Sequence, residues 1–172
     1  MDGSIQVYYG NGRGKTTAAL GLGIRAAGVG KQVIMVQFLK KKHSDTLDFL
    51  KKLEPELQIF RFEKAACGYS DLSPKEKQEQ MLNIKNALGY SRKVLDTGQC
   101  DLLILDEIFG LVDYNIITIE ELMDLIAVKK DSMDLILTGR NLPDEVREIA
   151  DCVYSIQREK EKTPEIFAQG NF

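Results

Sequence analysis

Residues 5–19 read Ile-Gln-Val-Tyr-Tyr-Gly-Asn-Gly-Arg-Gly-Lys-Thr-Thr-Ala-Ala, and this stretch decides the fold. Its first five residues form a β-type run, a glycine-rich segment follows, and residues 16–27 are rich in Ala and Leu and stop at Gly28. A strand, a loop and a helix are therefore predicted in succession. At a helix N-terminus the N–H groups of such a loop turn inward around an anion, so residues 10–17 are predicted to bind phosphate.

The predicted phosphate contacts are the residues of this loop and of the first helical turn: Gly10, Asn11, Gly12, Arg13, Gly14, Lys15, Thr16 and Thr17. Lys15 is expected to pair with phosphate oxygens of ATP, and Thr16 to offer its hydroxyl to Mg²⁺. Tyr9 stands where the usual Gly-x-x-x-x-Gly-Lys-Thr form has its first glycine, so the loop is interpreted as shortened. The alternative is a flexible glycine turn, but Gly-Lys-Thr-Thr opening a helix directly after a strand favours phosphate binding.

Apolar and β-branched runs alternate with helical patterns along the rest of the chain. Further strands are predicted at 32–38, 57–62, 101–106, 134–138 and 152–156, and helices at 45–53, 74–97, 119–128 and 143–150. Such alternation implies right-handed crossovers and a parallel sheet covered on both faces. We therefore expect an α/β, P-loop NTPase-like (RecA-like) three-layer αβα fold with a mainly parallel sheet of about six strands. The chain is read as a single domain, residues 1–172, with 157–172 as a C-terminal tail.

Composition narrows the classes of function. A length of 172 residues with 44% hydrophobic residues suits one core, and a net charge of -3 gives no basic field for nucleic acid. Three widely spaced cysteines fit reduced thiols in the cytoplasm. No apolar run approaches the roughly 18 residues that would span a bilayer. We expect no nucleic acid partner and no membrane partner.

Ligands of parallel sheets gather beyond the carboxyl ends of the strands. Asp106 and Glu107 end a strongly apolar strand, which is how P-loop proteins present the acid on the magnesium side. Asp106 is predicted to contact Mg²⁺ directly or through water, and Glu107 to make a second contact or act as general base. Two acids at this position also suit a helix N-terminus, but the phosphate loop favours the metal. Arg140 follows the next strand. It is predicted either to bind the phosphates through its guanidinium or to be an ordinary surface residue.

Three aromatic residues bracket a stretch that lacks clear periodicity. Phe60, Phe62 and Tyr69 surround Gly68 and are placed to close over a large apolar ligand. The alternative is that both phenylalanines point into the core and Tyr69 is an ordinary loop residue.

Together these residues make the chain resemble the ATP:corrinoid adenosyltransferases of the cobalamin-synthesis type that carry a P-loop. The resemblance spans roughly residues 5–156 and rests on several segments. They are Gly10-Asn11-Gly12-Arg13-Gly14-Lys15-Thr16-Thr17-Ala18-Ala19, Val36-Gln37-Phe38-Leu39-Lys40, Leu105-Asp106-Glu107, Leu137-Thr138-Gly139-Arg140 and Ala150-Asp151. The shortened loop is similar to this family's own phosphate segment, and the match adds Gln37 and Lys40 to the predicted binding residues.

The resemblance implies transfer of the 5′-deoxyadenosyl group of ATP to the Co(I) centre of a corrinoid substrate, with release of triphosphate. Co(I) is itself the nucleophile, which agrees with a sequence that offers no Ser, Cys or His constellation for that task. Lys15, Mg²⁺ and the loop N–H groups would stabilise the leaving triphosphate. Lys15, Asp106 and Glu107 are the residues assigned to catalysis, and Thr16, Asp106 and Glu107 those assigned to the metal.

The family also places apolar side chains where the lower axial ligand of cobalt would sit. Its loop commonly carries a Phe-Thr-Trp segment, whereas this chain has no Trp and reads Cys67-Gly68-Tyr69-Ser70-Asp71 there. Tyr69 and Phe62 are expected to substitute. The resemblance further implies a homodimer and an electron-donating reductase as partner.

Two other functions are compatible with the same motifs. A P-loop ATPase or kinase would act at the γ-phosphate, with Glu107 polarising the attacking water or hydroxyl. A nucleotide-dependent regulator without catalysis would have lost the corrinoid pocket, and the missing Trp makes this conceivable.

Overall fold

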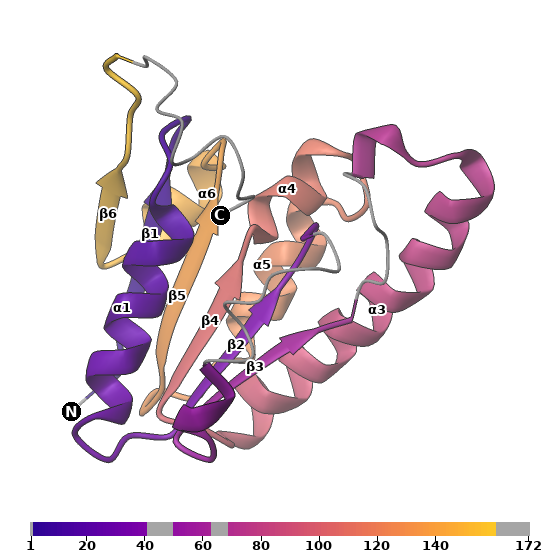
Figure 1. Cartoon of the computed structure of the whole chain (residues 1–172). Helices are drawn as coiled ribbons and strands as arrows, with labels where there is room; N and C mark the ends of the chain where they lie inside the picture. The colour runs from indigo at the N-terminus through magenta and orange to yellow at the C-terminus, as the bar shows by residue number, and fades with distance from the viewer. Residues whose placement is uncertain (1, 41–49, 63–68, 161–172) are drawn as a thin grey trace.

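The structure of the chain is a computed structural model that describes residues 2–40, 50–62 and 69–160 (Figure 1). Its strands are β1 (Ile5–Tyr9), β2 (Val33–Gln37), β3 (Leu57–Arg61), β4 (Leu102–Asp106), β5 (Asp134–Gly139) and β6 (Cys152–Ser155). Its helices are α1 (Lys15–Ala27), α3 (Pro74–Thr97), α4 (Ile108–Asp113), α5 (Ile119–Ala127) and α6 (Asp144–Ile149), with short 3-10 turns η1 (Lys51–Leu53) and η2 (Tyr69–Asp71).

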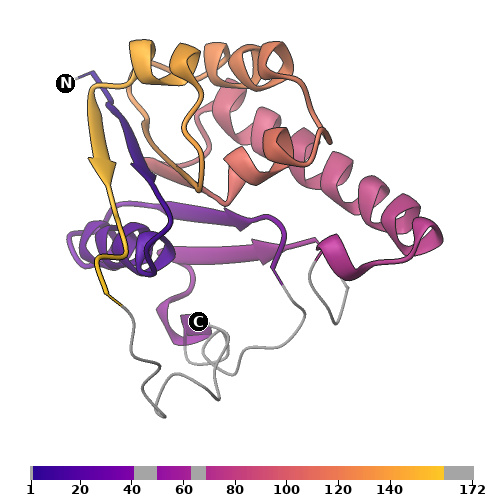
Figure 2. The same ribbon diagram turned by 90° about the horizontal axis from the view of Figure 1, so that it is seen from above.

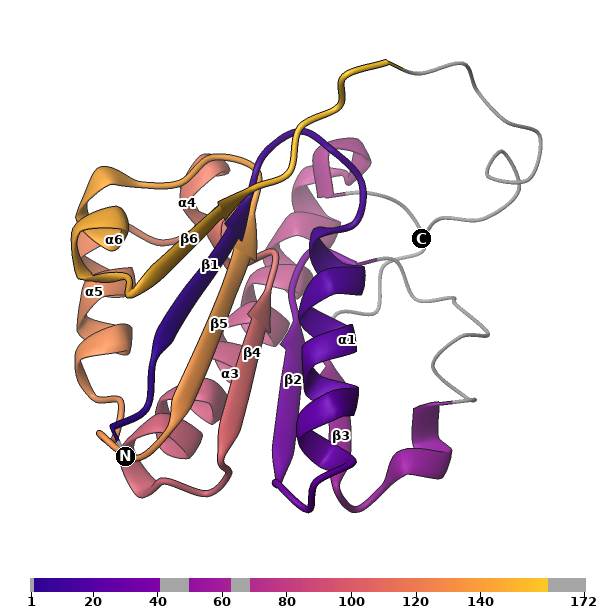
Figure 3. The same cartoon turned by 90° about the vertical axis from the view of Figure 1, so that its left-hand side faces the viewer.

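The strands form one six-stranded sheet in the order β3-β2-β4-β5-β1-β6, and every pair is parallel. Helix α1 covers one face, and α3, α4, α5 and α6 cover the other (Figures 2 and 3). The three-layer α/β prediction with about six strands is therefore confirmed. Because all strands run the same way, the ends of β2, β4 and β5 reach the same edge of the sheet, close to the N-terminus of α1.

Each face of the sheet has its own apolar core. The core under α1 contains Ala19, Met35 and Ile104, whereas the larger core under the other helices contains Leu103, Leu105 and Leu137. All residues of β2 and β4 are buried. This explains why these strands read as nearly continuous apolar runs rather than alternating ones.

Helix α3 begins and ends where its sequence signals predict. The Ser73 hydroxyl accepts the backbone N–H of Glu76, the Glu76 carboxylate caps the Ser73 N–H in return, and Pro74 stands at the start of the helix. Gly98 ends the helix in the left-handed conformation, with φ 68°. A 24-residue helix is thereby fixed across the back of the sheet.

The structure differs from the sequence prediction at one helix, and two predicted segments fall largely outside the described residues. Helix α4 was not anticipated, because Ile108–Asp113 is a short apolar segment with a glycine and no helical period. The helix expected at 45–53 falls largely outside the described residues, which show only the turn Lys51–Leu53 at its end. Most of the tail expected at 157–172 also lies outside them.

Within residues 2–40, 50–62 and 69–160, no helix combines the length and the apolar character that crossing a bilayer requires.

Helix α4 packs closely on β5, and we predict that Gly139→Ala will disturb this contact. A Cβ at Gly139 would overlap the Cβ of the fully buried Phe109, so the helix that follows Glu107 would have to shift. The expected loss in unfolding free energy is about 1–3 kcal/mol, measured by urea denaturation. Gly21→Ala in α1 is the control, because its added methyl meets no atom within 4 Å. It should be neutral or stabilising; equal behaviour of the two variants would contradict the close-packing argument.

Candidate active site

The phosphate loop connects β1 to α1 and is braced by the segment that follows β6. Gly10 has φ 121°, and a Cβ there would overlap the carbonyl oxygen of Ile156. The N–H of Gly12 donates to that same carbonyl at 2.9 Å, and the side-chain oxygen of Asn11 accepts the N–H of Arg158 at 3.0 Å. Asn11 is a predicted nucleotide contact, but in this structure its side-chain oxygen holds the loop against the segment that follows β6.

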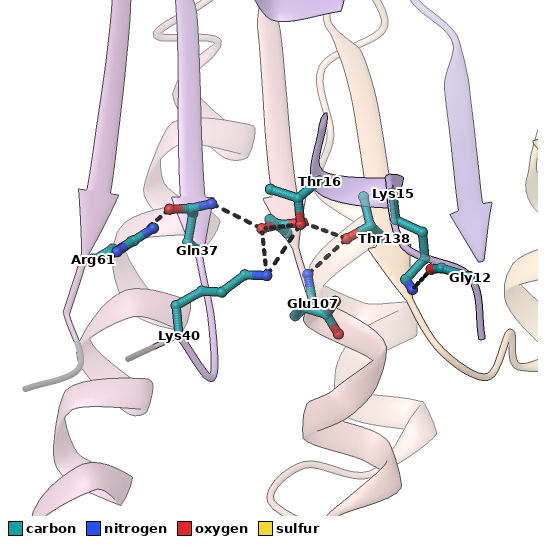
Figure 4. Close-up of polar contacts among 9 residues, drawn as sticks. Gly12, Lys15, Thr16, Gln37, Lys40, Arg61, Glu107 and Thr138 are labelled. Carbon is teal, nitrogen blue, oxygen red and sulfur yellow. Dashed lines mark hydrogen bonds and ion pairs between the residues drawn. The ribbon is translucent and has the colours of Figure 1, made fainter. Parts of the chain in front are cut away.

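Lys15 is the first residue of α1 and bends back into the loop. Its Nζ donates to the carbonyl oxygen of Gly10 at 2.8 Å. It also donates to the carbonyl oxygen of Gly12 at 3.0 Å (Figure 4). Partial burial is the main cause that lowers the pKa of Lys15, and Glu107 acts against it by raising that pKa. Lys40 lowers it further. The ammonium thus lies among the charged groups of the site, and its contact with phosphate stays a prediction.

Asp106 is the centre of the site. Its side chain is fully buried, and its oxygens accept hydrogen bonds from Thr16 Oγ1 (2.9 Å to Oδ1) and Thr138 Oγ1 (2.7 Å to Oδ1). The contact between Thr16 and Asp106 joins the phosphate loop to the end of β4. A buried carboxylate is tolerated only when such donors satisfy it.

Gln37 connects Asp106 to an arginine on the edge strand. Its Nε2 donates to Asp106 Oδ2 at 3.0 Å, and its Oε1 accepts from Arg61 Nε at 2.6 Å (Figure 4). Gln37 was predicted to bind the nucleotide, but it is 4% exposed and both ends of its amide are engaged within the protein. In this arrangement Gln37 orients the Asp106 carboxylate. Sequence reasoning missed Arg61, whose only signal was its place at the end of β3.

Thr138, in the segment Leu137-Thr138-Gly139-Arg140, contributes to the site in a way that the sequence alone does not predict. Besides donating to Asp106, its hydroxyl accepts the backbone N–H of Glu107 at 2.9 Å. Glu107 itself has φ 61° and stands at the N-cap position of α4, without a capping hydrogen bond from its side chain. A left-handed non-glycine residue at this point indicates a conformation that the surroundings impose. Thr138 therefore holds both acids of the site.

The other predicted contacts occupy the edge of this arrangement. Arg140 is exposed beside the loop: its carbonyl oxygen accepts the Gly10 N–H at 3.0 Å, and its charge contributes to lowering the pKa of Lys15. Arg13 and Gly14 are exposed on the loop, and Thr17 is exposed on the first turn of α1. Each is accessible to a ligand that reaches the loop.

The structure places the predicted aromatic residues Phe62 and Tyr69 in two different contacts. The ring of Phe62 lies 5.8 Å from that of Tyr90 on α3, next to the contact between Phe60 and Tyr90 at 4.9 Å. The ring of Tyr69 lies 5.2 Å from that of Tyr114, beyond the end of α4. Both are partly buried against the core. Gly68, which they bracket, lies outside the described residues.

The site thus combines a loop that suits a polyphosphate with a buried carboxylate and a hydroxyl that suit a hard cation. Comparisons with known proteins agree with this geometry. Residues 1–169 match the family model described as ATP:corrinoid adenosyltransferase BtuR/CobO/CobP. The corrinoid adenosyltransferase of Escherichia coli K12 is 30% identical over 155 residues, which is 90% of this chain and 76% of that protein, and that of Salmonella typhimurium is equally similar.

Among solved structures, a KaiC-like protein from Pyrococcus horikoshii matches with a TM-score of 0.62 at 19% identity, covering 94% of this chain and 75% of the other. That likeness concerns the fold alone. The match over residues 1–169 and the identity to the Escherichia coli enzyme establish more: the chain belongs to the ATP:corrinoid adenosyltransferase family.

Proposed function

We propose that this chain transfers the 5′-deoxyadenosyl group of ATP to the cobalt of a reduced corrinoid. The observation that carries the proposal is the joining of the phosphate loop to Asp106 through Thr16, in a chain of this family. In the reaction, the electron pair of Co(I) forms the bond to C5′. The bond from C5′ to its phosphate oxygen breaks, and its electron pair leaves with triphosphate. Cobalt becomes formally Co(III).

The protein's task in such a reaction is to position the substrates and to stabilise charge. Holding ATP by its triphosphate fixes C5′ for in-line attack, which removes orientational entropy from the barrier. Lys15, at the mouth of the loop, would stabilise the charge that grows on the leaving group, and Arg140 would add to its field. No protein nucleophile is needed, because the corrinoid supplies it.

Mg²⁺ fits the donors at this site. Among the described residues no three His, Cys, Asp or Glu side chains gather as a metal cluster, so the protein offers few ligands. Thr16 and Asp106 supply a hydroxyl and a carboxylate in mutual contact, and Mg²⁺ usually takes few protein ligands beside phosphates and water. When bound, Mg²⁺ would neutralise part of the triphosphate charge. Glu107, half-buried next to Asp106, is the further acid within the site.

Tyr69 and Phe62 are proposed to line the corrinoid's lower face. Their partly buried rings pack against Tyr114 and Tyr90 and offer aromatic surface to a large planar ligand. The homodimer and the reductase partner stay predictions.

The deciding experiment is an anaerobic assay with ATP, Mg²⁺ and chemically generated Co(I) cobalamin. A light-sensitive Co–C product with triphosphate released is expected. Formation of ADP and phosphate independently of corrinoid would show an ATPase instead. Nucleotide binding without any reaction would favour a regulator.

Lys15→Met should lower turnover by about 10²–10³-fold, because the variant lacks the preorganised positive charge that would stabilise the leaving triphosphate. Near-normal turnover of this variant would remove Lys15 from its assigned role.

Thr138→Val tests how Asp106 and Glu107 are held. The substitution keeps the shape but removes one hydrogen bond to Asp106 and the acceptor of the Glu107 N–H. We expect unfolding free energy to fall by about 1–3 kcal/mol, because buried polar groups lose partners. We also expect adenosyl transfer to fall with it. Thr97→Val is the control, since its hydroxyl donates to the Lys93 carbonyl oxygen on the exposed surface of α3. Unchanged stability and transfer in Thr138→Val would contradict the proposed positioning.

Tyr69→Ala and Phe62→Ala should each slow Co(II) reduction by roughly 10–100-fold while leaving ATP affinity nearly unchanged, because the groups that surround a metal tune its ligation and potential. The measurement is the rate of adenosylation from Co(II) cobalamin with a chemical reductant, beside an ATP titration. Tyr154→Ala, at the opposite edge of the sheet, is the aromatic control. If both variants match the control in corrinoid kinetics, neither residue belongs to the corrinoid site.

A further inference from the structure

The chain turns sharply after β2 and brings Lys40 back to the site. Phe38 is fully buried, and its N–H donates to the carbonyl oxygen of Asp106 at 2.9 Å. Leu39 follows with φ 55°, a left-handed conformation that costs energy for a branched side chain. The Leu39 side chain occupies the space that a Cβ of Gly110 would need, so α4 and this turn are fitted to each other. The position of Lys40 is thus imposed by packing.

At the end of this turn the ammonium of Lys40 contacts two of the three side chains that are predicted to bind the metal, Thr16 and Asp106. Its Nζ lies 3.2 Å from Thr16 Oγ1 and 3.7 Å from Asp106 Oδ2 (Figure 4). The Asp106 side chain is fully buried, whereas that of Lys40 is 24% exposed. The ammonium therefore approaches the open side of a carboxylate whose hydrogen-bond donors, from Thr16, Gln37 and Thr138, are neutral. The Lys15 ammonium also interacts with this carboxylate, but it donates its hydrogen bonds to the carbonyl oxygens of the phosphate loop.

An ammonium group and a divalent cation cannot share these oxygens. Two positive charges about 4 Å apart repel each other strongly in surroundings less polar than water, and a divalent ion doubles the repulsion. Either the lysine or the metal ion can neutralise Asp106 at close range. Lys40 can withdraw along its own flexible side chain, since it approaches from the partly exposed side.

We propose that Lys40 is a built-in substitute for the metal ion: its ammonium holds Thr16 and Asp106 while nucleotide is absent, and leaves them when a divalent cation arrives with ATP. The proposal rests on the metal role that the proposed function gives to these two residues. It follows that the nucleotide-free protein binds divalent cations poorly at this site. The cation enters as the complex with ATP, whose phosphates supply the ligands that compensate for displacing the lysine. Lys40 acts as a positioning residue through Asp106.

The test measures binding of Mn²⁺ alone to the nucleotide-free protein, using the electron paramagnetic resonance signal of free Mn²⁺. Lys40→Met should bind Mn²⁺ at least about tenfold more tightly than the unmodified chain, a change of about 1.4 kcal/mol. Lys40→Arg keeps the charge and should behave as the unmodified chain. Lys31→Met is the control for loss of a positive charge elsewhere, since Lys31 pairs with Asp134 at 3.1 Å on the surface. Circular dichroism checks that each variant folds, and Lys40→Gln replaces Lys40→Met if the latter does not.

A second substitution locates the gained affinity. Adding Thr16→Val to Lys40→Met should remove the gain, because the hydroxyl that the cation would use is lost. Equal Mn²⁺ affinity in Lys40→Met and the unmodified chain would overturn the proposal, as would a gain that survives Thr16→Val or appears equally in Lys31→Met. The experiment contains neither ATP nor corrinoid. If Lys40→Met does not change Mn²⁺ affinity while the unmodified chain forms the Co–C bond, only the proposed role of Lys40 is refuted. If the chain fails to transfer the adenosyl group, the proposed function is refuted and the Mn²⁺ result still stands.

Discussion

Burial of the Asp106 carboxylate is the constraint on which the rest of the site depends. A charge removed from water is costly unless it is surrounded by donors. Here the donors come from α1, β2 and β5, and an ammonium approaches from the turn after β2. Those elements are separated widely in the sequence, and a parallel sheet brings their ends to one edge. Correct strand order and register are therefore required before the carboxylate can be accommodated, which ties the fold to the site.

The same carboxylate is flanked by two strained residues. Glu107, its neighbour in the chain, has φ 61°, and Leu39, its neighbour across the strand ends, has φ 55°. Such conformations persist only where the surrounding structure determines them. Thr138 fixes the first through its hydroxyl, and the fitting of Leu39 against Gly110 fixes the second. With these two backbone conformations, Glu107 and Lys40 lie where their charges act on Lys15 of the phosphate loop.

The limits of the sequence prediction follow from what is local and what is not. Residues that signal through their own neighbourhood were predicted: the loop at 10–16, the ends of α3 at Ser73 and Gly98, and the acid at the end of β4. The contacts of Arg61 and Thr138 depend on β3, β2, β4 and β5 being neighbours in the sheet. No single segment of the sequence specifies this strand order, so these contacts were not predicted. Helix α4 was not predicted from the sequence, because its six residues complete fewer than two turns and are too few to show a helical period.

The shortened loop has a structural cause in the length of β1. Tyr9 stands where the usual phosphate loop has its first glycine, yet here it is still part of the strand, paired with Gly139 on one side and Ser155 on the other. The guanidinium of Arg147 lies 5.2 Å from its ring, on the surface of α6. The turn consequently starts one residue later, at Gly10, whose φ of 121° no larger residue adopts easily. Because Tyr9 belongs to the strand, the loop is one residue shorter than usual. The chain after β6 supports it through the hydrogen bonds that Gly12 and Asn11 make with this segment. The loop is thus shaped by the protein before any phosphate binds, and this preorganisation lowers the cost of holding ATP in a fixed orientation.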